Sequence, residues 1–389
     1  MLQQSFRELG VSAPVVDTLA ARSIHEPFRI QALVLPDALA GLDVLAKSPT
    51  GSGKTLAFAL PIVERTVAGD ARPSALVLVP TRELAAQVGS ELDALAPPKR
   101  LTVATVYGGL PLRAQAKRAA GAHIIVATPG RLEDLAERRL IDLSRIRILV
   151  LDEADRMLDM GFQPQVDRIV RRLPRNRQTM FFSATLDGAV GKLAHAYTNS
   201  ASQFEASQVA EDPGEIEHHF VPVTADTKVE TLVEHLRAAD GLTLVFVRTK
   251  RGADRLVQKL GRHDVRAVAM HGDMAQGARE RALTRFESGK VTTLVATDVA
   301  ARGLDLDDIT HVINFDPPGE DKDYVHRTGR TGRAGRSGRA ITLVLPEQQA
   351  ETSHVARRLG HREQFEEAGL QSARPKLLYT SRRGRRSKW

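Results

Sequence analysis

The sequence predicts an α/β protein with two tandem domains, each a mostly parallel sheet flanked by helices. Short apolar runs without polar interruption alternate with helical-looking stretches, a pattern typical of parallel strands covered on both faces. Nearly every run ends at or is followed by polar residues or glycine, where such sheets carry their ligands. The length of 389 residues also exceeds what one core usually holds.

The expected strands form two series in chain order. The first comprises the apolar stretch 42–46 and the runs 75–80, 123–128, 147–152 and 179–185. The second comprises 243–249, 266–272, 292–298, 311–316 and 340–345. Between them, residues 205–215 are polar, contain proline and glycine and have no periodicity, which is typical of a linker. We therefore expect an N-terminal domain at 1–204, a C-terminal domain at 216–346, and a helical segment with a basic, disordered tail at 347–389.

Composition excludes several classes of protein. Apolar residues make up 42% and charged residues 26%, as in globular proteins. No apolar run approaches the roughly 20 residues that cross a bilayer, and the first residues do not resemble a secretory signal. There are no cysteines, so disulfides and thiolate metal sites are excluded. A cytoplasmic location without membrane contact is expected.

The net charge of +8 is concentrated at the C-terminal end. The last sixteen residues, "RPKLLYTSRRGRRSKW", contain seven Lys and Arg residues and no acid. The rest of the chain is therefore close to neutral. This distribution favours a polyanionic partner over a tail kept only for solubility.

The stretch "SPTGSGKT" after the first expected strand is typical of a phosphate-binding loop. Its backbone N–H groups and the dipole of the next helix would surround the phosphates of a nucleotide. Lys54 would supply positive charge, and the Thr55 hydroxyl would bind Mg²⁺. The candidate nucleotide-binding residues are Ser48, Pro49, Thr50, Gly51, Ser52, Gly53, Lys54 and Thr55, with Ser48 in place of the usual first glycine.

Three carboxylates, Asp152, Glu153 and Asp155, follow the strand 147–152 in the sequence "DEAD". Like charges this close repel, which a divalent cation would relieve. We expect Asp152 to hold Mg²⁺ through water and Glu153 to orient and deprotonate the attacking water. An acidic first turn that favours the helix dipole explains any one of these acids but not the set.

Arginines recur among glycines in "HRTGRTGRAGRSGR", residues 326–339. Alone, this composition is also typical of a flexible segment that holds RNA loosely. It lies inside the second domain, before the strand 340–345, so we expect Arg330 and Arg333 to reach the γ-phosphate across a cleft between the domains.

These motifs together resemble the DEAD-box RNA helicases over about residues 5–345. The further matching segments are "PTREL" (80–84), "GG" (108–109), "TPGR" (128–131), "SAT" (183–185), "VFVRT" (245–249), "HGDMAQGARERAL" (271–283) and "TDVAARGLD" (297–305). The resemblance implies two RecA-like domains with ATP in the cleft between them, RNA-stimulated ATP hydrolysis and local, non-processive strand separation.

Adenine recognition is implied at residues 4–32. Gln31 resembles the glutamine that reads the adenine edge, and Phe6 the aromatic residue that packs on the base. The segment departs from the family at two places: Ile24 stands where an aromatic residue is usual, and Phe28-Arg29 replace a Thr-Pro pair. Asp305 resembles the residue that holds the ribose of ATP.

Other roles are carried over by resemblance. Residues implied in coupling hydrolysis to domain arrangement are Asp155, Ser183, Thr185 and His326. Residues implied in RNA binding are Arg82, Gly109, Thr128, Arg131, Arg248, Thr249, Gly272 and Thr297. These residue types suit sugar–phosphate contacts, so recognition indifferent to sequence is expected.

The sequence therefore predicts a monomeric RNA-dependent ATPase, with ATP and Mg²⁺ as cofactors, that remodels RNA or RNA–protein complexes. Analogy at family level points to complexes of ribosome assembly or RNA decay. The alternatives are a DNA helicase or translocase, an ATP-gated clamp on RNA, and a scaffold without activity. The scaffold is disfavoured because Lys54, Glu153 and Arg333 are all present.

Overall fold

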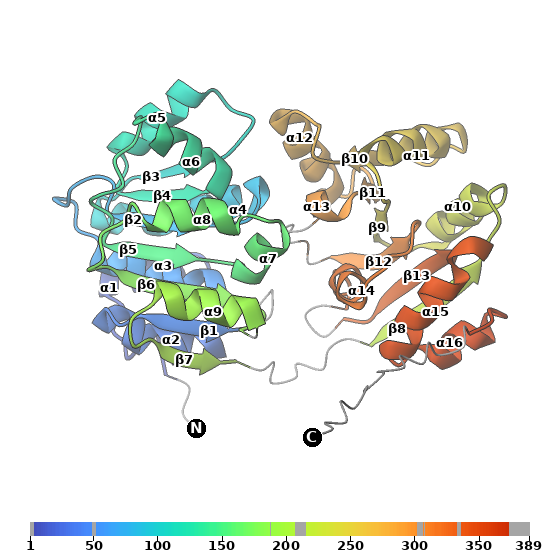
Figure 1. Ribbon diagram of the computed structural model, residues 1–389, viewed down its shortest axis with the longest axis horizontal. Coiled ribbons are helices and arrows are strands. Elements are labelled where there is room, and N and C mark those ends of the chain that lie inside the picture. Colours follow the sequence, from blue (N-terminus) through green and yellow to red (C-terminus); the bar gives the residue numbers. More distant parts are fainter. Residues whose placement is uncertain are drawn as a thin grey trace, which may run out of the picture. The chain divides into compact units, whose positions relative to one another are not determined.

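The computed structural model describes residues 4–48, 52–186, 188–206, 215–301, 306, 308–332 and 336–372. These residues form two compact units, each with its own sheet (Figure 1). All strand pairings given for the two sheets are parallel, so the predicted fold class is confirmed. In the described ranges, no helix combines the length and apolar character that a bilayer crossing requires. Most of the expected linker and the basic tail lie outside these ranges.

The first unit contains a seven-stranded sheet in the order β3-β4-β2-β5-β6-β1-β7. Its strands are β1 (Val44–Lys47), β2 (Ala75–Leu78), β3 (Val103–Val106), β4 (Ile124–Ala127), β5 (Ile148–Leu151), β6 (Gln178–Ser183) and β7 (Ser202–Glu205). Its helices are α1 (Ala13–Ala20), α2 (Arg29–Ala40), α3 (Lys54–Arg65), α4 (Arg82–Leu95), α5 (Leu112–Gly121), α6 (Pro129–Glu137), α7 (Ala154–Asp159), α8 (Gln163–Val170) and α9 (Gly188–Tyr197), with a 3₁₀ turn at Pro97–Lys99.

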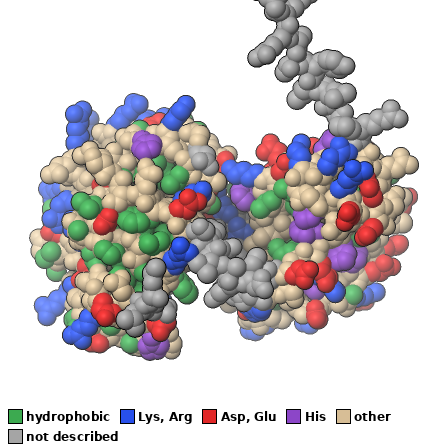
Figure 2. All heavy atoms as spheres, turned by 90° about the horizontal axis from the view of Figure 1, so that it is seen from below, with side chains coloured by type: hydrophobic (Ala, Val, Ile, Leu, Met, Phe, Trp, Pro, Cys, Tyr) green, Lys and Arg blue, Asp and Glu red, His purple; other side chains and the backbone are tan. Residues whose placement is uncertain are grey.

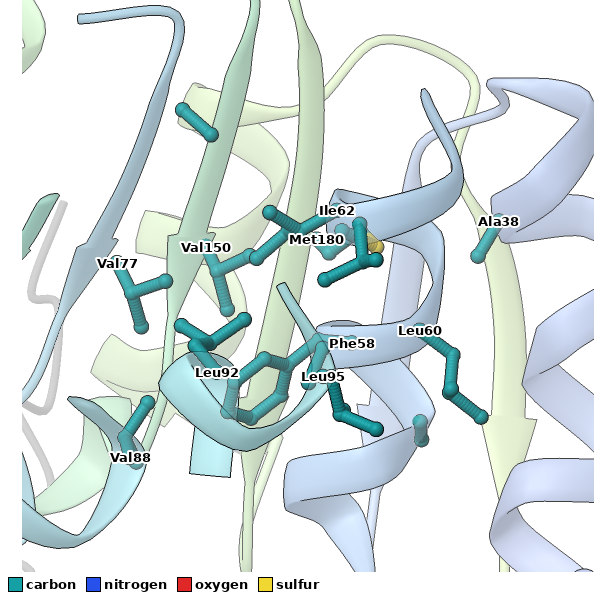
Figure 3. Packing of buried hydrophobic residues seen from close by; sticks show 14 of the residues in the cluster. Ala38, Phe58, Leu60, Ile62, Val77, Val88, Leu92, Leu95, Val150 and Met180 are labelled. Carbon is teal, nitrogen blue, oxygen red and sulfur yellow. The ribbon is translucent and has the colours of Figure 1, made fainter. Parts of the chain in front are cut away.

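Both faces of this sheet are buried. Alternate residues of a strand point to opposite faces, so Val150 packs with α1 to α4 whereas Leu149 and Leu151 pack with α5 to α9. Figure 3 shows the first of these cores, with Phe58 of α3 beside Leu92 and Leu95 of α4. Burial on both faces explains why the central strands are continuous apolar runs.

The second unit contains a six-stranded sheet in the order β10-β11-β9-β12-β13-β8. Its strands are β8 (Ile216–Pro222), β9 (Leu242–Phe246), β10 (Ala267–Met270), β11 (Thr293–Ala296), β12 (Ile309–Asn314) and β13 (Gly338–Val344). Its helices are α10 (Lys228–Ala238), α11 (Lys250–Arg262), α12 (Gln276–Glu287), α13 (Asp298–Ala301), α14 (Asp321–Thr328), α15 (Gln349–Arg358) and α16 (Arg362–Glu367), with a 3₁₀ turn at Pro346–Gln348.

The last two helices belong to the packed part of the second unit. Phe365 of α16 and Val355 of α15 are buried in one cluster with Phe220 of β8 and Tyr324 of α14. The Phe220 and Phe365 rings meet edge to face, with centroids 5.2 Å apart. The packed chain therefore continues past residue 346, where the sequence places the end of the domain.

Candidate nucleotide and nucleic-acid site

The phosphate-loop residues join the end of β1 to the start of α3. The Ser48 N–H donates to the Ser183 carbonyl oxygen (3.0 Å), which ties the loop to the end of β6. Lys54 is 8% exposed, and its ammonium donates to the Ser48 carbonyl oxygen at 2.8 Å. Gly53 precedes the helix with φ +82°, a conformation that favours glycine. Pro49, Thr50 and Gly51 lie outside the described residues, whereas the described Ser52 Oγ accepts from Ser48 Oγ.

Gln31 connects this loop to the start of α2. Its Nε2 donates to the Gly53 carbonyl oxygen at 2.9 Å, and its Oε1 accepts from the Phe28 N–H at 2.9 Å. The side chain is 1% exposed. Adenine reading by Gln31 stays a prediction. The two bonds leave one N–H and one lone pair of the amide unused, but the buried side chain would have to become accessible to a base. The same contacts fix the position of Phe28 relative to the phosphate loop.

Phe6 occupies a different environment from the one that the resemblance implies. It is 1% exposed and lies in one core cluster with residues of α1 and α2, among them Val15 and Leu19. Packing on a base would require the ring to leave this core. Ile24 is partly buried against the same cluster. Neither residue offers an open apolar surface in this structure.

Asp152 follows β5 and is the most perturbed acid of the site. It is 3% exposed, and its Oδ1 accepts from the Glu153 N–H at 2.9 Å. Burial raises the pKa of Asp152 to about 7; the Lys54 ammonium opposes this, and the Glu153 and Asp155 carboxylates add to it. A buried carboxylate beside two others is a suitable partner for a divalent cation. Within the described chain, no three His, Cys, Asp or Glu side chains are grouped to hold a metal by themselves.

Glu153 has an unusual backbone. Its φ of +50° and ψ of +49° are left-handed, which is uncommon for a residue with a side chain and costs free energy that the surroundings must offset. Its carboxylate forms a buried ion pair with Arg156, one turn along α7. Figure 1 shows α7 beginning where β5 ends. The strained residue is therefore held between the strand end and its own helix.

Ser183 links β6 to the acidic segment. Its Oγ accepts from the backbone N–H of Asp155 and from that of Thr185, both at 3.3 Å. The resemblance implies hydroxyl contacts to Asp155; in this structure the contact reaches the Asp155 backbone. Thr185 itself is exposed. Ser183, Asp155 and the phosphate loop are thus joined, because the Ser183 carbonyl also accepts from Ser48.

Strand order divides the carboxyl edge of the first sheet into two halves. Neighbouring strands β5, β6 and β1 carry the acids, Ser183 and the phosphate loop. Neighbouring strands β3, β4 and β2 carry the candidate RNA contacts, which are Gly109, Thr128, Arg131 and Arg82. Because carboxyl ends of parallel strands meet at one edge, the structure brings each predicted set together without mixing the two sets.

The candidate RNA residues of the first unit are also interconnected. The Arg131 guanidinium donates to the Leu110 carbonyl oxygen (2.9 Å) and to Gln115 Oε1 (3.0 Å), so it orders the loop that contains Gly109. Gly109 is exposed with φ +94°. A Cβ at the neighbouring Gly108 would lie 3.1 Å from an Arg82 nitrogen, so Arg82 lies directly over this loop.

The second unit gathers its candidate RNA residues on three neighbouring strands. Arg248 and Thr249 follow β9, Gly272 follows β10, and Thr297 follows β11. Thr249 caps α11 by accepting from the Gly252 N–H at 3.0 Å. The Arg248 N–H donates to Asp316 Oδ2 at 2.9 Å, which ties its backbone to the segment that follows β12.

Arg327, which the sequence did not single out, is the centre of a polar network in the second unit. It is 5% exposed and forms a two-pronged ion pair with Asp298 at 2.6 and 2.7 Å. It also donates to Asn314 Oδ1 and to the Asp316 carbonyl oxygen. The residues lie on α13, α14 and the end of β12, so sequence spacing carried no signal for the contact.

The arginines expected to reach ATP are only partly described. Arg330 is 5% exposed, and the adjacent Thr331 hydroxyl donates to the Ile309 carbonyl oxygen at 2.6 Å. A role at the γ-phosphate would require the Arg330 side chain to become accessible. His326 is half-buried on α14. Arg333 and Asp305 lie outside the described residues.

Surface charge is mixed on the face drawn in Figure 2. Lys and Arg side chains are interspersed with Asp and Glu on each unit. This agrees with a body whose charges nearly balance when the basic tail is set aside. Local loops, rather than the charge of this face as a whole, would therefore have to supply RNA contacts.

Comparison with family models gives two matches. Residues 28–193 match the DEAD/DEAH box helicase model, and residues 227–335 match the helicase conserved C-terminal domain. Among curated relatives, the DEAD-box ATP-dependent RNA helicase CshA of Geobacillus kaustophilus is 39% identical over 355 residues, covering 91% of this chain and 76% of that protein. CshA of Streptococcus pneumoniae is 41% identical over 345 residues, covering 88% of this chain but only 66% of that protein.

The chain is also similar to solved structures of DEAD-box proteins. Dbp5 of Saccharomyces cerevisiae, bound to RNA and ADP BeF3, is 31% identical, with a TM-score of 0.81 and 95% of each chain covered. A DEAD box protein from Methanococcus jannaschii is 34% identical, with a TM-score of 0.53, covering 95% of this chain and 99% of that one.

Proposed function

This chain belongs to the DEAD/DEAH-box helicase family, and on that premise we propose that it is an RNA-dependent ATPase that locally separates short RNA duplexes and remodels RNA or RNA–protein complexes. The observation that carries the proposal is the division of the carboxyl edge of the first sheet. One half carries the phosphate loop and the acids, and the other half carries residue types suited to the sugar–phosphate backbone of RNA. Relatives named as ATP-dependent RNA helicases, and a neighbour solved with RNA, support RNA as the polymer.

The half of the edge formed by β5, β6 and β1 would bind the nucleotide and position the attacking water. Lys54 and the N–H groups at the start of α3 would hold the phosphates, and Thr55 and Asp152 would hold Mg²⁺, the latter through water. The cation would neutralise charge on the transferring phosphoryl group. Glu153 would orient the attacking water and accept its proton, once its carboxylate is released from Arg156.

The half of the edge formed by β3, β4 and β2 would contact the sugar–phosphate backbone of RNA. Arg82 and Arg131 offer guanidinium groups, while Gly109 offers an exposed backbone and Thr128 a hydroxyl. In this proposal these groups contact phosphates and sugars rather than base edges, so binding would be indifferent to sequence. Contacts to 2′-hydroxyls would distinguish RNA from DNA.

Coupling is proposed to arise from closure of the two units. ATP and RNA would each bind better to a closed arrangement, so each would favour the other. Arg330 and Arg333 would complete the nucleotide site only in that arrangement. Hydrolysis would then reopen the units and release the RNA strand.

The test measures ATP hydrolysis with single-stranded RNA, with DNA of the same sequence and with no polymer, together with displacement of a short RNA duplex. We expect RNA, but not DNA, to stimulate ATP hydrolysis, and we expect displacement of the RNA duplex to require ATP. Equal stimulation by DNA would indicate a DNA translocase. Stimulation by RNA without displacement would indicate a clamp and would contradict the unwinding activity.

A further inference from the structure

Phe28 lies at the nucleotide site with its ring open to solvent. Its side chain is 61% exposed, and among the residues that the structure describes it is the only exposed Phe, Tyr or Trp. Apolar side chains scattered singly on a surface need no explanation. A phenylalanine beside a phosphate loop is a different case. Its apolar ring is exposed to water, which is unfavourable, and it contributes little to the hydrophobic core.

One close approach of the ring and two hydrogen bonds place Phe28 beside the loop. A Cβ built on Gly53 would lie 2.3 Å from Phe28 Cδ2, so the ring edge already occupies the space beside the loop backbone. The Phe28 N–H donates to Gln31 Oε1, and Gln31 Nε2 donates to the Gly53 carbonyl oxygen. Phe28, Gln31 and Gly53 therefore form one connected group, defined by backbone and amide contacts.

The other apolar candidates for contact with a base are committed elsewhere. Phe6 is 1% exposed in the core, and Ile24 is partly buried against the same cluster. A purine base needs an accessible flat surface for stacking, and base–aromatic stacking is sequence-tolerant but substantial in free energy. Of the three residues, only Phe28 offers such a surface.

We propose that Phe28 supplies the aromatic face on which the adenine of ATP packs in this chain, in place of Phe6. This rests on the proposed function, because it assumes that the triphosphate occupies the adjoining loop. In the proposed arrangement Phe28 lies on the face of the base, and the buried Gln31 holds the Phe28 backbone in place through the hydrogen bond from its N–H. The exposed ring is then explained as a surface that ligand binding covers.

The test compares binding of Mg–ADP and of Mg–pyrophosphate by isothermal titration calorimetry, because pyrophosphate has no base. We expect Phe28→Ala to weaken ADP binding about 5- to 100-fold, the range for loss of one stacked aromatic, and to change pyrophosphate binding less than about two-fold. Phe28→Trp should retain ADP binding within about three-fold. Val67→Ala, which shortens another exposed apolar side chain of the same unit (60% exposed), is the matched control and should change neither.

Three results would overturn the proposal. One is Phe28→Ala with the ADP affinity of the native chain. Another is equal loss of ADP and pyrophosphate, which would mean that the ring only shapes the loop. The third is Phe6→Leu, which keeps an apolar side chain in the core, weakening ADP binding as much as Phe28→Ala. A native chain that binds neither ligand would instead contradict the nucleotide site itself.

Discussion

The Ser183 hydroxyl oxygen accepts hydrogen bonds from the backbone N–H groups of Asp155 and Thr185, both at 3.3 Å. One side chain thus connects the end of β6 to the acidic segment after β5. Ser183 is 0% exposed, so its hydroxyl is not in contact with bulk solvent. Loss of this acceptor leaves the N–H of the buried Asp155 without its partner, which costs about 1–3 kcal/mol, whereas the exposed Thr185 can bond water instead.

Ser183→Ala should therefore loosen the link between the acids and the strand end while leaving the phosphate loop intact. We expect the affinity for Mg–ADP to change less than about three-fold and ATP-dependent duplex displacement to fall by about ten-fold or more, since about 1.4 kcal/mol corresponds to a factor of ten. Thr185→Val is the control, because it keeps the backbone N–H that reaches Ser183. If Thr185→Val abolishes displacement and Ser183→Ala does not, the Thr185 hydroxyl carries the coupling instead.

Substitution of Lys54 should impair nucleotide binding, whereas substitution of Glu153 should impair hydrolysis. Lys54→Ala removes the cation that contacts the loop carbonyl, so nucleotide affinity should fall at least about 100-fold. Glu153→Gln keeps the size of the side chain but removes the base, so ATP should bind with nearly native affinity while turnover falls about 10²–10⁴-fold. Equilibrium binding and single-turnover hydrolysis separate the two outcomes. Equal loss of nucleotide in both variants would contradict the assigned roles.

Arg327 should be critical for the stability of the second unit. Arg327→Ala leaves Asp298 without its buried partner and Asn314 without a donor, for which we expect a loss of about 2–4 kcal/mol. The matched control is Arg339→Ala, since Arg339 pairs with Glu217 at a site where both side chains are more than half exposed. That variant should lose less than about 1 kcal/mol. Hydrogen exchange of the β12 amides, together with urea unfolding, measures both losses; similar values for the two variants would refute the central role of Arg327.

The apolar runs predicted most central strands, because strands buried on both faces leave a continuous signal. Three strands at sheet edges, β3, β7 and β8, were not among the expected runs. In them buried or half-buried residues alternate with more exposed ones, so the runs are broken by polar side chains such as Gln203 and His218. The motifs were assigned to strand ends correctly because each follows a continuous apolar run, whose end is easy to locate in the sequence.

The arrangement of the site depended on contacts between distant segments, which spacing alone does not reveal. Strand order, which places β1 beside β6 rather than β2, decides that Ser48 meets Ser183 across 135 residues of chain. The bond between Gln31 and Gly53 and the exposure of Phe28 likewise follow from packing of α2 on α3. Residue types predicted the chemistry, and long-range packing decides which residues are accessible to perform it.

Stability of the second unit should decrease in mild acid because of His218. This ring is half-buried, stacked on His361 with centroids 3.8 Å apart, and its Nδ1 lies 2.9 Å from the Tyr324 hydroxyl. Burial, with smaller contributions from the charges of His361 and His219, lowers the pKa of His218 to about 4 from its ordinary 6.5. The unfolded chain then binds the proton first as the pH falls.

The free energy of unfolding should therefore be highest above about pH 6.5 and fall by about 1–2 kcal/mol between about pH 6.5 and 4, since partial exposure of the ring reduces the full effect. His218→Phe keeps an aromatic ring and should flatten this dependence in urea unfolding followed at several pH values. His25→Gln, at an exposed position, should leave it as in the native chain. An unchanged slope in His218→Phe would assign the acid sensitivity to other groups.

The basic tail should contribute to RNA affinity through charge. Residues 374–389 contain seven Lys and Arg residues and no acid, whereas the remainder of the chain is nearly neutral. Binding to phosphates releases counterions from the RNA, so the slope of log affinity against log salt should become shallower by about 0.7 for each phosphate of a single strand that the tail no longer binds. Truncation after residue 373 should therefore weaken RNA binding at low salt and flatten its salt dependence, while basal ATP hydrolysis without RNA stays the same.

A chain of full length in which the seven basic residues of the tail are replaced by glutamine separates charge from length. Because the proposed contribution is electrostatic, this variant should match the truncation both in RNA affinity at low salt and in the slope of the salt dependence. Titration of a fluorescently labelled single-stranded RNA at several salt concentrations measures both quantities. If both variants keep the native slope, the tail does not touch RNA phosphates and serves only solubility.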